Sequence, residues 1–314
     1  MKRAIKQANG LFLSIILLYL GIVVLLSFLA SRGIFAGNVF TLLLGEALIG
    51  VPALLMLVWN RSEWKEWKEW IPLCKIKVST VLLLIVFAYL VMPLAMLANA
   101  LSLFFVENQM VNSMSGMTDV PMVLLVFITG IYGPVCEEIA FRGVIFCRYR
   151  RTGRILGAVL LSALLFGLMH LNGNQLGYAA ILGFVFAMLV EATGSIWAPF
   201  IVHAVINTHN TIMLMMSESF LKLAGTPEAL SELSYTKTEL AMTVAVLLPI
   251  AAFMTVLAVG GFILIARNEG RLNHVKAIFA KRNPDQPKVN FVTWSLVVAV
   301  LLCIFVIFVL PFKR

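Results

Sequence analysis

The chain has 314 residues and a formal net charge of +9, with 61% hydrophobic but only 12% charged side chains. Soluble domains carry about a quarter charged residues, so this chain has too little polar surface to stay dissolved as a globular monomer. The composition predicts an all-α, polytopic integral membrane protein. It excludes a disordered chain, a disulfide-stapled secreted domain and a soluble nucleic-acid binder.

Nine apolar stretches approach the length needed to cross a hydrocarbon layer of about 30 Å. Because the boundaries of such stretches are uncertain by several residues, we expect about eight to nine transmembrane helices. In chain order the stretches are 11–30, 39–59, 78–103, 121–147, 155–172, 175–192, 195–217, 239–265 and 290–311.

The basic residues gather on one side of the predicted membrane. With the N-terminus in the cytosol, 18 of the 24 lysines and arginines lie in cytosolic segments, mainly around 61–77, 148–154 and 266–289. This asymmetry predicts the topology and explains the positive charge without nucleic acid. Three tryptophans spaced three residues apart, Trp64, Trp67 and Trp70, predict an interfacial anchor in contact with membrane lipid.

The fourth stretch carries charges that a bilayer-spanning segment should avoid. Glu138 and Arg142 are four residues apart and share a helical face, so we expect an ion pair. Glu137 points about 100° away and keeps no cation on its own helix. Pro134, one turn earlier, removes a backbone hydrogen bond and can open a water-accessible pocket beside the carboxylates. Intramembrane charges indicate a functional site, although a purely structural network is the alternative.

Two further stretches carry polar pairs at helical spacing. Phe166 and His170 are four residues apart in the fifth stretch, as are His203 and Asn207 in the seventh. Counted from the cytosolic end of each helix at about 1.5 Å per residue, Glu137 and His203 lie at about 12–15 Å, Asn207 at about 18 Å and His170 at about 22 Å. With helix tilt the four can converge near mid-membrane.

This set of side chains suits hydrolysis of an amide bond. Glu137 can take a proton from water, and His203 and Asn207 can donate hydrogen bonds to the developing oxyanion. Two other mechanisms use the same residues: a zinc ion held by Glu137 and the histidines, or attack by Cys136. We prefer a site without metal or cofactor, because there is no HExxH pattern and a buried thiol is usually inert.

Other polar residues receive simpler interpretations. Glu46 could reach the pocket, but a single carboxylate is weak evidence. We expect Glu191 to be solvated at a helix end, His209 and His274 to be structural, and the four cysteines to act as small core residues without disulfides.

Three motifs together resemble a known family. Cys136 to Gly143 is similar to the EExxxR motif of the CAAX-protease and bacteriocin-processing (Abi) family of intramembrane endopeptidases. Phe166 to His170 resembles the family's FxxxH motif, and His203 to Asn207 resembles its HxxxN motif. The resemblance implies that Glu137 is the base, His170 helps to hold the water, and His203 and Asn207 form the oxyanion hole. It implies that Glu138 and Arg142 support the site, and we add Phe166 to that supporting set.

The resemblance covers about residues 121–217, which we interpret as the catalytic core between N-terminal helices 1–120 and C-terminal helices 218–314. It implies a glutamic-type membrane endopeptidase without a metal. Its substrate would be a peptide or a lipidated protein, and its location a multi-pass position in a bacterial plasma membrane. Family members process prenylated CAAX proteins or are linked to bacteriocin immunity, so a silent scaffold that binds peptide without cutting it is the alternative.

Overall fold

A computed structural model describes residues 2–59, 72–106, 120–223, 236–280 and 290–310, without the side chains of 218–223. The predicted tryptophan anchor at Trp64, Trp67 and Trp70 lies outside these residues. The described residues are almost entirely helical, and one antiparallel bridge joins Leu73 to Ser195. The all-α prediction is confirmed.

Each of the nine apolar stretches contains helix. The N-terminal helices are α1 (Lys2–Ser31), α2 (Asn38–Trp59) and α4 (Val78–Ser102). One continuous helical run follows, made of α6 (Met122–Phe127), α7 (Gly133–Glu138) and α8 (Cys147–Arg150), with π-helical turns at Ile128–Tyr132 and Ile139–Phe146. The remaining helices are α9 (Ile155–Met169), α10 (Gly173–Thr193), α11 (Trp197–Leu223), α12 (Lys237–Asn268), α13 (Leu272–Ile278) and α14 (Trp294–Ile304), which continues as a π-helical turn.

Six of these segments are long and apolar enough to cross a membrane: α1, α2, α4, the run from α6 to α8, α10 and α12. Helix α9 and the segment Trp294–Val309 are apolar but shorter. Helix α11 spans 27 residues but carries histidines and asparagines along its length. These findings establish a multi-pass helical membrane protein.

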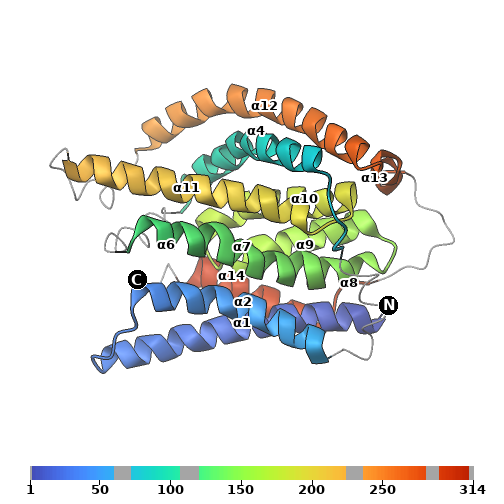
Figure 1. Ribbon diagram of the computed structural model, residues 1–314. Helices are drawn as coiled ribbons and strands as arrows, with labels where there is room; N and C mark the ends of the chain where they lie inside the picture. The colour runs from blue at the N-terminus through green and yellow to red at the C-terminus, as the bar shows by residue number, and fades with distance from the viewer. Residues whose placement is uncertain (1, 60–71, 107–119, 224–235, 281–289, 311–314) are drawn as a thin grey trace.

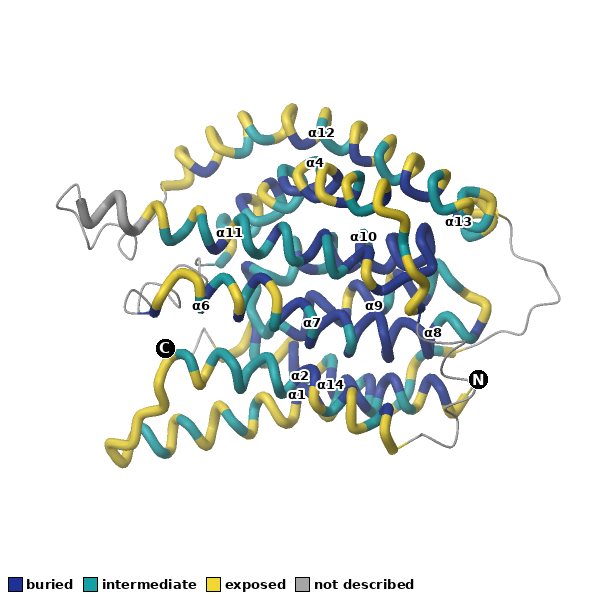
Figure 2. The backbone as a smooth tube through the Cα atoms, in the orientation of Figure 1, coloured by how far each residue is buried: buried dark blue, intermediate teal, exposed yellow. Residues whose placement is uncertain are grey.

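The helices lie side by side in a bundle with the α6–α8 run, α9 and α10 at its centre (Figure 1). Helices α1 and α2 cover one side, and α4 and α12 cover the other, where they pack against each other. Burial follows the same order, since α7, α9 and α10 are largely buried whereas α1 and α12 present exposed residues (Figure 2).

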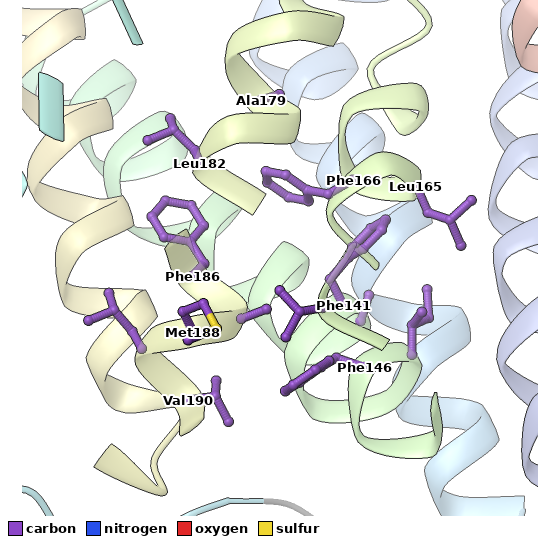
Figure 3. Close-up of a cluster of buried hydrophobic side chains, with 14 of the residues drawn as sticks. Phe141, Phe146, Leu165, Phe166, Ala179, Leu182, Phe186, Met188 and Val190 are labelled. Atoms are coloured by element: carbon purple, nitrogen blue, oxygen red, sulfur yellow. The ribbon is translucent and has the colours of Figure 1, made fainter. Parts of the chain in front are cut away.

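The outer surface of α12 shows how the bundle meets lipid. Phe253 and Val256 are 62% and 70% exposed, and many other large apolar side chains are exposed on the outer helices. In water such a surface would drive aggregation, but a bilayer solvates it. The core between the central helices is built from close-packed aromatic and aliphatic side chains, including Phe141, Phe166 and Phe186 (Figure 3).

Two side chains differ from their sequence-based interpretation. Glu191 is fully buried, and its carboxylate pairs with Arg150 at 2.9 Å and with His274 at 2.5 Å, so the expectation that it is solvated was wrong. Its partners come from α8 and α13, distant in sequence, which is why local pattern could not reveal them. Cys74 is exposed and therefore does not pack as a core residue, whereas the other three cysteines are buried and all four are free thiols.

Candidate active site

The central helix is locally widened by a π-helical turn just before the proline that precedes the carboxylates. In the π-helical turn Ile128–Tyr132, the N–H of Gly133 bonds the carbonyl of Ile128, five residues back. The next donor in that register would come from position 134, but Pro134 has no N–H. The carbonyl of Thr129 is thus left without that donor, and Asn207 of α11 supplies one from Nδ2 at 3.1 Å.

Small residues let α11 come close enough for this bond. A Cβ on Gly130 would lie 2.2 Å from Oγ1 and 3.3 Å from Cα of Thr208, so only glycine fits there. The hydroxyls of Thr129 and Thr211 also hydrogen-bond at 2.7 Å. The helical run that carries the first motif is therefore joined to α11, which carries the third motif, through backbone as well as through side chains.

The predicted ion pair between Glu138 and Arg142 is present and deeply buried. Arg142 Nη1 lies 3.0 Å from Glu138 Oε1, and both side chains are at most 2% exposed. Arg142 Nη2 donates to the carbonyl of Gly183 in α10 at 3.2 Å. The guanidinium carbon lies 4.3 Å from the ring centroid of Phe166 and 5.0 Å from that of Phe186, so both rings make cation–π contacts with Arg142.

His203 lies between the two adjacent carboxylates. Its Nδ1 is 3.0 Å from Glu138 Oε1, and its Nε2 is 3.7 Å from Glu137 Oε2. Because a carboxylate only accepts, Nδ1 carries the proton that bonds Glu138. Asn207 Nδ2 lies 3.3 Å from Nε2 and donates to it, so Nε2 is the acceptor in this arrangement. Phe186 stacks on the imidazole at 4.8 Å and fixes its plane.

His170 stands directly after the last residue of α9 and is oriented in a different way. Its Nδ1 bonds the carbonyl of Phe166 at 2.8 Å. A carbonyl only accepts, so Nδ1 carries the proton and Nε2 keeps a free lone pair that can accept from water. The ring of Phe166 contacts both histidines, with centroids 5.2 Å from His170 and 6.0 Å from His203. The second and third motifs thus meet across Phe166.

Glu137 is 7% exposed, and its Oε2 has no hydrogen-bond partner in the described structure. A buried carboxylate oxygen without a donor is costly, and such a group can bind and polarise a water molecule. The structure therefore brings the seven predicted residues together at the centre of the bundle, from α7 to α11. Their catalytic roles stay predictions.

Phe186 and Gly183 of α10 belong to the site, although no sequence motif marked them. Gly183 lets α9 and α10 touch, because a Cβ there would lie 3.0 Å from Cα of Ala163. The sequence does show that both residues lie in the apolar stretch between the second and third motifs. The spacing of apolar residues in one sequence, however, does not show which face of a fully buried helix contacts a charged side chain.

The other two mechanisms find less support in the geometry. Among the described residues, no three His, Cys, Asp or Glu side chains gather as metal ligands. The Cys136 thiol packs against α2, where a Cβ on Gly50 would lie 2.8 Å from Sγ, and His170 is bonded to its own helix instead.

Comparisons with known proteins point to the same segment. Residues 119–209 match the family described as type II CAAX prenyl endopeptidase Rce1-like. The similarity to this family is thus confined to the segment 119–209. This confirms the resemblance seen in the motifs, since all three fall inside the match.

The chain is also similar to a Bacillus subtilis (strain 168) protein described as "Putative membrane peptidase YdiL", with 36% identity over 90 residues. That match covers 29% of this chain and 37% of the relative, so the chain matches little more than a third of the relative's length. No solved structure matches the chain.

Proposed function

We propose that the protein is a membrane-embedded endopeptidase of the glutamic type that hydrolyses a peptide bond with a water molecule activated by Glu137. The observation that carries the proposal is a buried carboxylate oxygen without a donor, 3.7 Å from His203 and inside an Rce1-like segment. The match to a membrane peptidase supports the same class of activity.

The geometry suggests how the proton moves. Glu137 takes a proton from water as the water oxygen bonds to the carbonyl carbon of the substrate. His203 can receive that proton at Nε2, and its Nδ1 bond to Glu138 stabilises the resulting imidazolium. The protonated His203 then donates to the oxyanion. Beside it lies the Asn207 N–H, which bonds His203 Nε2 in the structure and is the second donor to the oxyanion. The proton finally passes to the leaving amine as the C–N bond breaks.

The proposed substrate is a membrane-associated peptide or lipidated protein, because the reacting groups lie at the centre of a bundle whose outer surface is apolar. The proposed setting is a bacterial plasma membrane with the N-terminus in the cytosol, supported by the distribution of lysine and arginine. No nucleic acid, metal or cofactor enters the mechanism.

The test is peptide cleavage by purified protein in detergent, read by mass spectrometry on a proteome-derived peptide library and on farnesylated peptides with a CAAX end. Glu137→Gln keeps the size of the side chain but removes the base, so we expect kcat to fall by about 10²- to 10⁴-fold. Glu239→Gln on α12 is the matched control, because Glu239 is an exposed residue of a capping box that glutamine preserves.

Each reaction is repeated with a strong chelator. Activity that disappears in Glu137→Gln and ignores the chelator supports the proposal. Activity that is lost to chelator and restored by zinc would make Glu137 a ligand and overturn the metal-free mechanism. Tight peptide binding without cleavage by either protein would favour the silent scaffold.

A further inference from the structure

A second carboxylate faces the candidate base from α2. Glu46 packs against Gly133, where a Cβ would lie 3.0 Å from the carboxyl carbon of Glu46. One turn later on both helices, a Cβ on Gly50 would lie 2.8 Å from Sγ of Cys136. The second contact lies one turn further toward the C-terminus of both helices, so α2 and α7 run parallel, as Figure 1 shows. The glycines permit their close approach.

Helix geometry aims Glu137 at the same spot. Gly133 and Glu137 are four residues apart and lie on one face of α7. Side chains on a helix lean toward its N-terminus, so the Glu137 side chain extends over the turn that contains Gly133. The Glu46 carboxyl group fills the space that Gly133 leaves open. The Oε2 atom of each carboxylate is buried without a hydrogen-bond partner in the described structure.

The charges around this pair do not balance if both carboxylates are ionised. The Arg142 guanidinium is engaged by Glu138 at 3.0 Å. His203 receives an N–H from Asn207 at Nε2 and is therefore neutral in this arrangement. Among the residues that the structure describes, the other titratable side chains beside the pair are neutral hydroxyls and a thiol: Tyr19, Tyr132 and Cys136 beside Glu46, and Tyr178 beside Glu137. Two like charges cannot stay side by side in such an apolar place, so one proton is retained.

We propose that Glu46 and Glu137 share one proton, and that Glu46 is a positioning residue whose O–H donates to Glu137 and aims the other Glu137 oxygen at the reacting water. The positioning role rests on the proposed endopeptidase function. The shared proton does not, because it follows from packing and charge alone.

The proton balance of the reaction is closed. The pair begins with one proton and one negative charge. Glu137 gains a second proton from water, whose oxygen bonds to the carbonyl carbon. That proton then leaves, by way of His203, for the amine nitrogen as the C–N bond breaks. The pair ends with the single proton with which it began, so no outside acid or base is needed.

The test combines infrared spectroscopy with kinetics on the full-length protein in detergent. A shared proton gives a carboxylic-acid C=O stretching band at neutral pH in the wild-type protein. We expect the difference spectrum to show that this band is lost in Glu46→Gln and unchanged in the control Glu239→Gln. We also expect kcat of Glu46→Met, whose side chain has no donor, to fall by about 10- to 100-fold with KM unchanged, because Glu137 loses one charged hydrogen bond. Glu46→Gln keeps an amide N–H that can donate to Glu137, so its kcat should fall less. Glu46→Asp keeps a carboxyl group and restores part of kcat.

The outcomes separate the two proposals. A carboxylic-acid band that persists in Glu46→Gln would place the proton on Glu137 alone and overturn the sharing. Wild-type kcat in Glu46→Met would overturn the positioning role. If the wild-type protein cleaves no peptide, the infrared result still decides the shared proton, and only the proposed function fails. If Glu46→Gln does not fold, an unshifted band in Glu46→Asp contradicts the sharing and a shifted band supports it.

Discussion

Replacing Arg142 by methionine tests whether the buried ion pair holds the site together. The substitution keeps an unbranched side chain but removes the charge that faces Glu138, and both side chains are at most 2% exposed. Breaking a buried pair by removing one partner costs about 3–5 kcal/mol, because an uncompensated charge stays behind. The cation–π contacts with Phe166 and Phe186 add roughly 0.5–2 kcal/mol. We therefore expect Arg142→Met to lower the free energy of unfolding by about 3.5–7 kcal/mol.

The double variant Glu138→Gln with Arg142→Met separates an ion pair from an ordinary hydrogen bond. It removes both charges, so it should recover more than half of the loss and give a coupling energy of at least about 2 kcal/mol. Interhelical hydrogen bonds in membranes average only about 0.6 kcal/mol in such cycles, so the two interpretations are well separated.

The assay is titration of purified protein in mixed micelles with a denaturing detergent, followed by tryptophan fluorescence. Arg32→Met is the matched control, because Arg32 is exposed and makes a single cation–π contact with Phe28 at 5.3 Å. We expect that change to cost less than about 1 kcal/mol. Additive effects of Glu138→Gln and Arg142→Met, or a loss no larger than that of the control, would refute the reasoning.

Two further substitutions test packing and buried charge. Gly133→Ala places a Cβ 3.0 Å from the carboxyl carbon of Glu46, so we expect a loss of about 1–3 kcal/mol in unfolding free energy, whereas Gly177→Ala, with nothing within 4 Å, should not destabilise. Equal thermal stability of the two variants would contradict the close approach of α2 and α7. Glu191→Gln leaves the partly exposed Arg150 without its buried carboxylate, so we expect a loss of about 1–3 kcal/mol. A melting temperature within one degree of wild type would show that the carboxylate is solvated after all.

The pairs within one helix were predictable because helical spacing fixes them. Glu138 and Arg142 form the expected ion pair, and the expected neighbours Phe166 and His170 contact each other, as do His203 and Asn207. Four residues is one turn, so sequence alone determines these contacts.

Contacts between helices were predictable only where a motif marked both sides. Glu191 was misread because its partners Arg150 and His274 lie 41 and 83 residues away. The Phe186 ring that stacks on His203 gave no signal, since its helix is apolar on every side. Glu46 was visible as an isolated carboxylate in an apolar stretch, but the glycine that makes room for it lies on another helix.

The backbone explains why the site needs so few motif residues to be ordered. A carbonyl oxygen anchors one polar side chain from each motif: Gly183 accepts from Arg142, Phe166 from His170 and Thr129 from Asn207. Because a carbonyl oxygen only accepts, the nitrogen that bonds it must carry a proton. The carbonyl therefore determines which nitrogen of the side chain stays free for chemistry. Two of the carbonyls are available for backbone reasons, because Pro134 lacks an N–H and α9 ends at Met169. Because the acceptor is a backbone carbonyl, such a hydrogen bond does not depend on which side chain the accepting residue carries. The geometry of the site therefore follows from where helices widen into π-helical turns and where they end as much as from the motifs themselves.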